Sequence, residues 1–169
     1  MLAGLVLLTA CKGKTDNLSG GLSDISDTVS GISEAKAREV NKNVFRVPKG
    51  AENVKWDILN PSTEGGAPVL KFDFDLDGKT FLAREELTES SAYALTEQSY
   101  EWTAIEPFSF TDKSGNTLSG ESYRYIGENE YADLCIWYDL ESGMCYSVFV
   151  RAESLDGFDL QAIVEEITP

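Results

Sequence analysis

The chain has 169 residues, with 14 lysines and arginines against 29 aspartates and glutamates, no histidine, and a net charge of −15. Because phosphate contacts need lysine and arginine, this balance argues against nucleic acid as a partner and against polybasic docking on anionic lipid. The absence of histidine excludes Ser-His and Cys-His dyads and His-ligated zinc sites, and the length suits one domain with a tail.

The chain begins with an apolar run over residues 2–8, which ends in the string Leu8-Thr9-Ala10-Cys11. This run is too short to span a bilayer, which needs about 20 residues. Its position and the small residues after it are typical of an export signal. The Leu-Thr-Ala-Cys string resembles the lipobox of bacterial lipoproteins. That resemblance implies that the thiol of Cys11 receives a diacylglyceryl group and that Cys11 becomes the first residue of the mature chain.

We therefore expect a lipoprotein held in the cell membrane through Cys11, on the extracytoplasmic side. Two acyl chains such as palmitate anchor a protein stably, since each buried CH2 contributes roughly 0.8 kcal/mol. No lysine or arginine precedes the apolar run, although export signals begin with a basic segment. We expect residues 1–10 to be a signal peptide shortened at its start, with translation beginning upstream. The alternative is an ordinary buried strand or helix at these residues.

Residues 11–43 are predicted to form a lipidated, flexible tether. They are rich in serine, glycine, aspartate and lysine, contain no aromatic residue, and carry equal numbers of basic and acidic side chains. A coil of this length reaches about 30 Å. A second interpretation stays open, because five apolar residues recur at helical spacing in the same segment and would suit a helix formed on oligomerisation or docking. These are Leu18, Leu22, Ile25, Val29 and Ile32.

Residues 44–169 carry the whole net charge and are predicted to form the extracytoplasmic domain. Apolar residues at every second position predict strands over 54–58 and 70–76, the second with one polar side. Asp77-Gly78 predicts a hairpin turn, with the chain returning through residues 80–83. Residues 84–99 are polar, and their pattern leaves a short helix or a loop open.

The second half predicts a strand pair at 102–110 and 119–126, and then a last hairpin formed by 133–140 and 144–151. Both sides of that hairpin carry apolar residues, which indicates a central pair covered on both faces. A final helix, capped by Asp156, presents one apolar stripe and is expected to provide a cover. The fold class predicted is α+β: a mainly antiparallel sheet with a C-terminal amphipathic helix packed on it.

One motif suggests a cation site. Asp73, Asp75 and Asp77, followed by Gly78, match the first half of an EF-hand calcium loop. The twelfth position of such a loop needs a bidentate acid, and here it is Arg84. The alternative places the three aspartates in a row on the solvent side of a strand, where they do not converge.

The two cysteines of the last hairpin are predicted to form no disulfide. With a two-residue loop at 142–143, Cys135 faces Val150 and Cys145 faces Leu140, which puts the two sulfurs on opposite sides of the sheet. We expect mostly buried thiols that act as small apolar side chains.

An exposed aromatic surface for stacking a sugar or a peptide is a further possibility. Tyr123 and Tyr125 share one side of their strand, and Tyr131 follows among acidic residues. Packing of these rings in the core is the alternative.

Several segments of the C-terminal half resemble an uncharacterised domain family found outside the membrane of Gram-positive bacteria, on lipoproteins and on the outer parts of anti-sigma-like regulators. The segments are Tyr125-Ile-Gly127, Leu134-Cys-Ile-Trp137-Tyr-Asp139, Gly143-Met-Cys-Tyr146-Ser147-Val148 and Leu155-Asp-Gly-Phe-Asp-Leu160-Gln-Ala-Ile-Val164. The segment Phe45-Arg-Val-Pro48-Lys-Gly50 is similar to the first strand of that family, and the resemblance covers most of residues 45–169. The resemblance implies location and fold, and it implies no catalytic residues.

No nucleophile-base pair or metal-ligand spacing stands out from the sequence. We therefore predict a non-enzymatic domain that binds or senses an unknown protein or small molecule, with no cofactor. One alternative is a structural or assembly partner of a membrane complex. A second is an enzyme that uses carboxylates alone, since residues 44–169 offer 24 of them.

Overall fold

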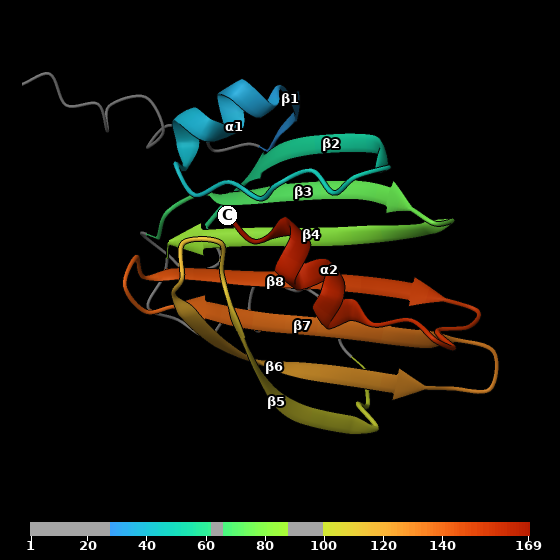
Figure 1. Cartoon of the computed structure of the whole chain (residues 1–169). Coiled ribbons are helices and arrows are strands. Elements are labelled where there is room, and N and C mark those ends of the chain that lie inside the picture. The colour runs from blue at the N-terminus through green and yellow to red at the C-terminus, as the bar shows by residue number, and fades with distance from the viewer. Residues whose placement is uncertain (1–27, 62–65, 88–99) are drawn as a thin grey trace, which may run out of the picture.

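The computed structural model describes residues 28–61, 66–87 and 100–169. They form one antiparallel sheet with two short helices on it (Figure 1). The predicted α+β class, mainly sheet with a C-terminal helix, is confirmed. In chain order the elements are β1 Val29–Ile32, α1 Glu34–Val40, β2 Glu52–Leu59, β3 Val69–Leu76, β4 Lys79–Leu87, β5 Ala104–Thr111, β6 Thr117–Ile126, β7 Tyr131–Asp139, β8 Met144–Ala152 and α2 Leu160–Ile167.

The sheet consists of two four-stranded meanders that meet in its middle. The strand order is β1-β2-β3-β4-β8-β7-β6-β5, so each meander starts at an outer edge and runs inward. Strands β4 and β8 join the halves through seven residue pairs, from Phe81↔Val150 to Leu87↔Met144. The predicted last hairpin is β7 and β8. It lies inside the sheet, which confirms that it is a central pair.

Both faces of the sheet bury apolar side chains. We call the face that α2 covers the α2 face, and Figure 1 shows α2 lying across β8 and β7 there. Its core includes Phe45, Phe72, Phe81, Trp137, Tyr146, Val164 and Ile167. The opposite face has a smaller cluster, made of Val69, Ala132, Leu134, Ile136, Cys145 and Phe149. Because β7 and β8 contribute to both clusters, their sequences are apolar at nearly every position.

The first meander follows its local sequence signals. Leu70, Phe72 and Phe74 are buried, each at most 1% exposed, and they alternate with polar residues as predicted for a half-buried strand. Asp77 and Gly78 form the turn to β4, and both have a positive φ, 49° and 73°. A two-residue hairpin needs that left-handed backbone, which glycine and aspartate adopt most readily.

Strand β4 extends beyond its predicted end. Residues 84–87, which the sequence left as helix or loop, continue β4 and pair with β8. Three of them are ionisable and yet buried: Arg84 is 7% exposed, and Glu85 and Glu86 are 1% exposed. Pairing of the whole segment with β8, and of residues 84 and 85 also with β3, fixes an extended backbone that the polar composition did not predict. The rest of the ambiguous segment, residues 88–99, lies outside the described residues.

The turn between β7 and β8 has four residues instead of the predicted two. Asp139 pairs with Met144, so Cys135 faces Val148 and not Val150. The carboxylate of Asp139 determines this geometry, because it accepts the backbone N–H groups of residues 141 and 142 at 3.0 and 3.2 Å. The register shifts by two residues, so each side chain keeps its predicted face.

The C-terminal helix begins later than predicted. Its N-cap is Asp159, whose Oδ1 accepts the backbone N–H of Gln161 at 3.0 Å, and not Asp156. Gly157 has a left-handed φ of 69°, which interrupts any helix that starts at Asp156. The predicted apolar stripe is confirmed, since Leu160, Val164 and Ile167 are buried against the sheet.

The N-terminal part of the domain differs from the predicted boundary at residue 44. Within the predicted tether, β1 pairs with β2 and α1 lies beside it, with Ala37 fully buried. Val29–Ile32, assigned to a conditional helix in one interpretation, is an edge strand because β2 offers it a pairing partner. The other residues of that helical pattern, 18–25, lie outside the described residues. Among the described helices, none is long and apolar enough to cross a membrane.

The sheet is closely packed around Gly120 on β6. A Cβ at this position would lie 2.1 Å from the carbonyl oxygen of Ile136, 2.8 Å from Cβ of Trp137 and 2.9 Å from Phe108. Because the nearest atom belongs to the backbone, Gly120→Ala is expected to lower the free energy of unfolding by about 1–3 kcal/mol. Urea unfolding followed by tryptophan fluorescence measures this, with Ser119→Ala at the exposed neighbouring position as control. Equal stability of the two variants would contradict the packing described.

Candidate functional site

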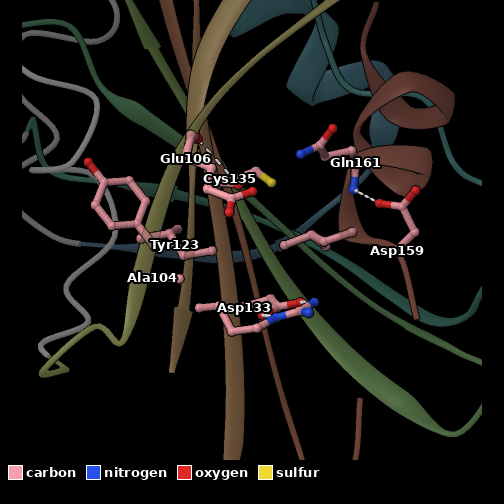
Figure 2. Close-up of a pocket in the computed structure, with 11 residues that line it drawn as sticks. Ala104, Glu106, Tyr123, Asp133, Cys135, Asp159 and Gln161 are labelled. Atoms are coloured by element: carbon pink, nitrogen blue, oxygen red, sulfur yellow. Dashed lines mark hydrogen bonds and ion pairs between the residues drawn. The ribbon is translucent and has the colours of Figure 1, made fainter. Parts of the chain in front are cut away.

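A hollow of about 210 Å³ opens on the α2 face, between strands β5, β6 and β7 and the beginning of α2 (Figure 2). Cross-strand pairing brings its walls together, because Ala104 faces Arg124 on β6 and Arg124 faces Asp133 on β7. The next rung on the same face runs from Glu106 through Ser122 to Cys135. The polar side chains that line the hollow are Glu106, Ser122, Arg124, Asp133, Asp159 and Gln161.

An ion pair forms the strongest contact in this hollow. The guanidinium of Arg124 donates to both carboxylate oxygens of Asp133, at 2.8 Å from Nε and 2.6 Å from Nη2. Asp133 is almost buried, with 6% of its side chain exposed, whereas Arg124 is 46% exposed. The hydrogen bond with Asp133 raises the pKa of Arg124, and the charges of Asp159 and Glu106 act in the same direction. The guanidinium is therefore fixed in its charged form.

The thiol of Cys135 lies at the floor of the hollow, and Figure 2 shows its sulfur directed toward α2. Burial raises the pKa of this thiol far above its ordinary value, and the charges of Asp133 and Asp159 add to the effect. A thiol is nucleophilic only as thiolate, so Cys135 is chemically inert at neutral pH. On the opposite face, burial raises the pKa of Cys145 to about 11. The two cysteines form no disulfide and are buried, as predicted.

The charge of the hollow is negative. Three carboxylates, from Glu106, Asp133 and Asp159, face the single guanidinium of Arg124. Glu106 and Asp159 are exposed and lie on different walls of the hollow, one on β5 and one at the N-cap of α2. This arrangement favours a ligand that carries a positive charge or donates hydrogen bonds.

The three aspartates of the calcium-like motif do not converge. Asp73 pairs with Nζ of Lys71 at 2.6 Å. Asp75 accepts from Nδ2 of Asn53 at 2.7 Å and from Oγ1 of Thr80 at 2.6 Å, and these bonds lower its pKa. Asp77 lies in the turn to β4. Within the described residues, no group of three acidic or cysteine side chains is placed to hold a metal ion.

The predicted tyrosine surface is divided between the two faces. Tyr123 and Tyr125 lie on the opposite face, where they are half-buried against Tyr100 and Trp102. Tyr131 packs on the α2 face. On the opposite face, the ring centroids of Tyr100 and Tyr125 are 5.0 Å apart, and those of Trp102 and Tyr123 are 5.6 Å apart. The aromatic cluster is thus formed by the first two tyrosines with residues that precede β5.

Sequence reasoning did not find the hollow. Arg124 and Asp133 are nine residues apart on two strands, and their contact depends on the register of β6 and β7. The tight turn after Ile126, where Gly127 donates its N–H to the carbonyl oxygen of Glu130, sets that register and was the available signal. Asp159 has no such signal, because α2 reaches the hollow only through tertiary packing.

Comparisons of the chain with protein-family models, with curated proteins and with solved structures found no match. The family resemblance of the C-terminal half therefore stays a prediction. Cys11, the predicted lipidation site, lies outside the described residues.

Removing one partner of the ion pair is expected to cost more stability than removing the other. Arg124→Gln leaves the buried carboxylate of Asp133 without its counter-charge and is expected to lower the free energy of unfolding by about 3 kcal/mol. Asp133→Asn leaves a half-exposed guanidinium, which water solvates, and is expected to cost only about 1 kcal/mol. Urea unfolding at neutral pH measures both.

The matched control is Arg151→Gln, because Arg151 forms a longer, solvent-exposed ion pair with Glu130 at 3.8 Å. A change within about 0.5 kcal/mol is expected there. If Asp133→Asn were as costly as Arg124→Gln, the burial assigned to Asp133 would be wrong.

Proposed function

We propose that the chain is an extracytoplasmic lipoprotein, anchored in the membrane through lipidated Cys11, and that its domain is a non-enzymatic binding or sensing module. The anchor is supported by the apolar run and the Leu-Thr-Ala-Cys string that ends it. The binding role is supported by the acidic hollow at the start of α2.

A single observation carries the binding role: two charged side chains of the hollow, Arg124 and Asp159, are already held in place. Asp133 fixes Arg124 by two hydrogen bonds, and the backbone of Gln161 fixes Asp159. The floor is a protonated thiol. Such groups orient a ligand without a nucleophile being activated, so the site suits recognition better than bond cleavage.

The ligand class follows from the charge. Glu106 and Asp159 face the hollow from opposite walls, and the ion pair leaves a net negative site. A small ligand with a protonated amine would gain charge-assisted hydrogen bonds to both carboxylates.

The anchor is tested by metabolic labelling of the full-length gene product with an alkyne analogue of palmitate in a bacterium that processes lipoproteins. The wild-type protein is expected to carry label and to partition into detergent, because two acyl chains hold it in the membrane. Cys11→Ser is expected to lose both properties, whereas the control Cys135→Ala, at a buried thiol, keeps them. An unlabelled wild-type protein would refute the anchor.

The hollow is tested with spermidine, a small polyamine that is protonated at neutral pH. We expect spermidine to raise the melting temperature of the wild-type protein, and to raise that of Glu106→Gln clearly less, because one of the two carboxylates is neutral there. Glu128→Gln, which removes an exposed charge outside the hollow, is the matched control for the non-specific attraction of an acidic protein. If both variants lose the same part of the shift, the hollow is not the binding site.

A further inference from the structure

Glu85 is a carboxylic acid inside the hydrophobic core. It lies near the C-terminal end of β4 on the α2 face, between Leu70 on β3 and Tyr146 on β8. Only 1% of its surface is exposed. The cross-strand row continues from Tyr146 to Trp137, which is fully buried. A carboxyl group in such a place depends on the few polar atoms that reach it.

Both hydrogen bonds to Glu85 come from one segment, residues 41–47, which we call the strap. Oε1 of Glu85 accepts from Nδ2 of Asn41 at 3.0 Å, and the carboxyl also accepts the backbone N–H of Phe45. Within the described part of the chain, Oε2 has no partner, and neither has Nε1 of Trp137 in the same row. The closed strap therefore satisfies only part of the polar atoms beneath it.

The strap is the cover over this row of side chains. Figure 1 shows the coil after α1 running along the face that α2 occupies. Phe45 packs on Trp137 and Tyr146, with ring centroids 6.1 and 5.6 Å away. The backbone N–H of Arg46 donates to the carbonyl oxygen of Ile167 at the end of α2, at 2.7 Å. Lifting the strap would break these contacts together and admit water to Glu85.

The titratable groups near Glu85 lie on α1, on the strap and on strands β4 and β8. Arg38 on α1 is the cation that favours its ionised form. Lys42 of the strap and Glu86 of β4 line a neighbouring hollow of about 280 Å³ with it. Tyr146 on β8 has a pKa raised first by burial and then by the charge of Glu85.

Burial dominates this balance. It raises the pKa of Glu85 well above its ordinary value, against the opposing effects of Asn41, the N–H of Phe45 and Arg38. The carboxyl is therefore neutral over a range of pH in which an exposed glutamate is ionised.

We propose that Glu85 is a proton-operated latch: the neutral acid allows the strap to lie closed on the sheet, and loss of its proton releases the strap. A carboxylate at this position would have one oxygen without a partner in an apolar surrounding, which costs more than the neutral acid does. Release of the strap relieves this cost, because both hydrogen-bond donors to the carboxyl belong to the strap and its Phe45 covers the neighbouring Tyr146. Release also hydrates Nε1 of Trp137.

The direction with pH follows from linkage. The folded pKa lies above the unfolded value, so the contribution of Glu85 to closure is fully present below the ordinary carboxyl pKa and is lost as pH rises toward the folded pKa. Closure is thus favoured in acid and weakened in alkali. The strap continues from the chain that leads back to Cys11. A link between release and the membrane anchor rests on the proposed function, whereas the latch itself does not.

Hydrogen exchange of the backbone N–H of Arg46 reports closure, because that N–H donates to α2 only when the strap is down. In the full wild-type chain we expect its protection factor to fall by about tenfold or more between about pH 5 and about pH 9. Each unit by which the pKa of Glu85 differs between the closed and the open strap changes the ratio of closed to open molecules tenfold. Glu85→Gln keeps an oxygen acceptor and cannot ionise. Its protection factor is expected to stay constant over the same range.

Glu166→Gln is the matched control. Glu166 on α2 accepts the backbone N–H of Lys49 just beyond the strap at 2.8 Å, but it is exposed to solvent. This variant is expected to retain the fall with pH. A flat wild-type profile, or an equal fall in Glu85→Gln, would overturn the latch.

If Glu85→Gln does not fold, the carboxyl of Glu85 in the wild-type protein is titrated by carbon NMR. Titration at the ordinary carboxyl pKa, with the N–H of Arg46 still protected, overturns the proposal. Titration at a raised pH, together with loss of that protection, supports it. Neither result depends on lipidation or on the acidic hollow.

Discussion

The pairing of β4 with β8 is the constraint on which the rest of the structure depends. These two strands join the meanders, so the two halves of the sheet are hydrogen-bonded to each other through their seven residue pairs. The same pairing keeps residues 84–87 extended although three of them have ionisable side chains. It also places Glu85 directly beside Tyr146, with Trp137 next in the row. A stable central pair thus carries an ionisable group into the core.

Two buried carboxyl groups lie on the α2 face, and the groups bonded to each determine whether its charged or its neutral form is favoured. Asp133 has a bidentate guanidinium, which compensates its charge while water still reaches the outer side of Arg124. Glu85 has an amide and a backbone N–H, and its second oxygen has no partner among the described residues. The first carboxylate therefore acts as a fixed charge, and the second is most stable as a neutral acid.

Local signals predicted the local structure well, and most of their failures come from pairing or packing with distant sequence. Alternation identified residues 70–76 as a half-buried strand, and Asp77-Gly78 identified its turn, because both features depend on neighbouring residues alone. The continuation of β4 through 84–87 depends on pairing with β8, which comes from distant sequence. The acidic hollow likewise needs the β6–β7 register and the position of α2. Asp156 met the composition rule for an N-cap, but the backbone of Gly157 moved the cap to Asp159.

The helix α2 connects the two sites. It has eight residues, so its ends are about 12 Å apart. At its beginning, Asp159 lines the acidic hollow, and at its end the carbonyl oxygen of Ile167 accepts the N–H of Arg46 from the strap. Strap and hollow therefore share one rigid element that is held to the sheet by Leu160, Val164 and Ile167. A ligand in the hollow and a proton on Glu85 would affect each other only if they stabilise different positions of this helix, because coupling requires an element with two arrangements that both sites bias. The bond between Arg46 and Ile167 is the contact where such a difference would arise, since it is made in the closed arrangement and broken in the open one.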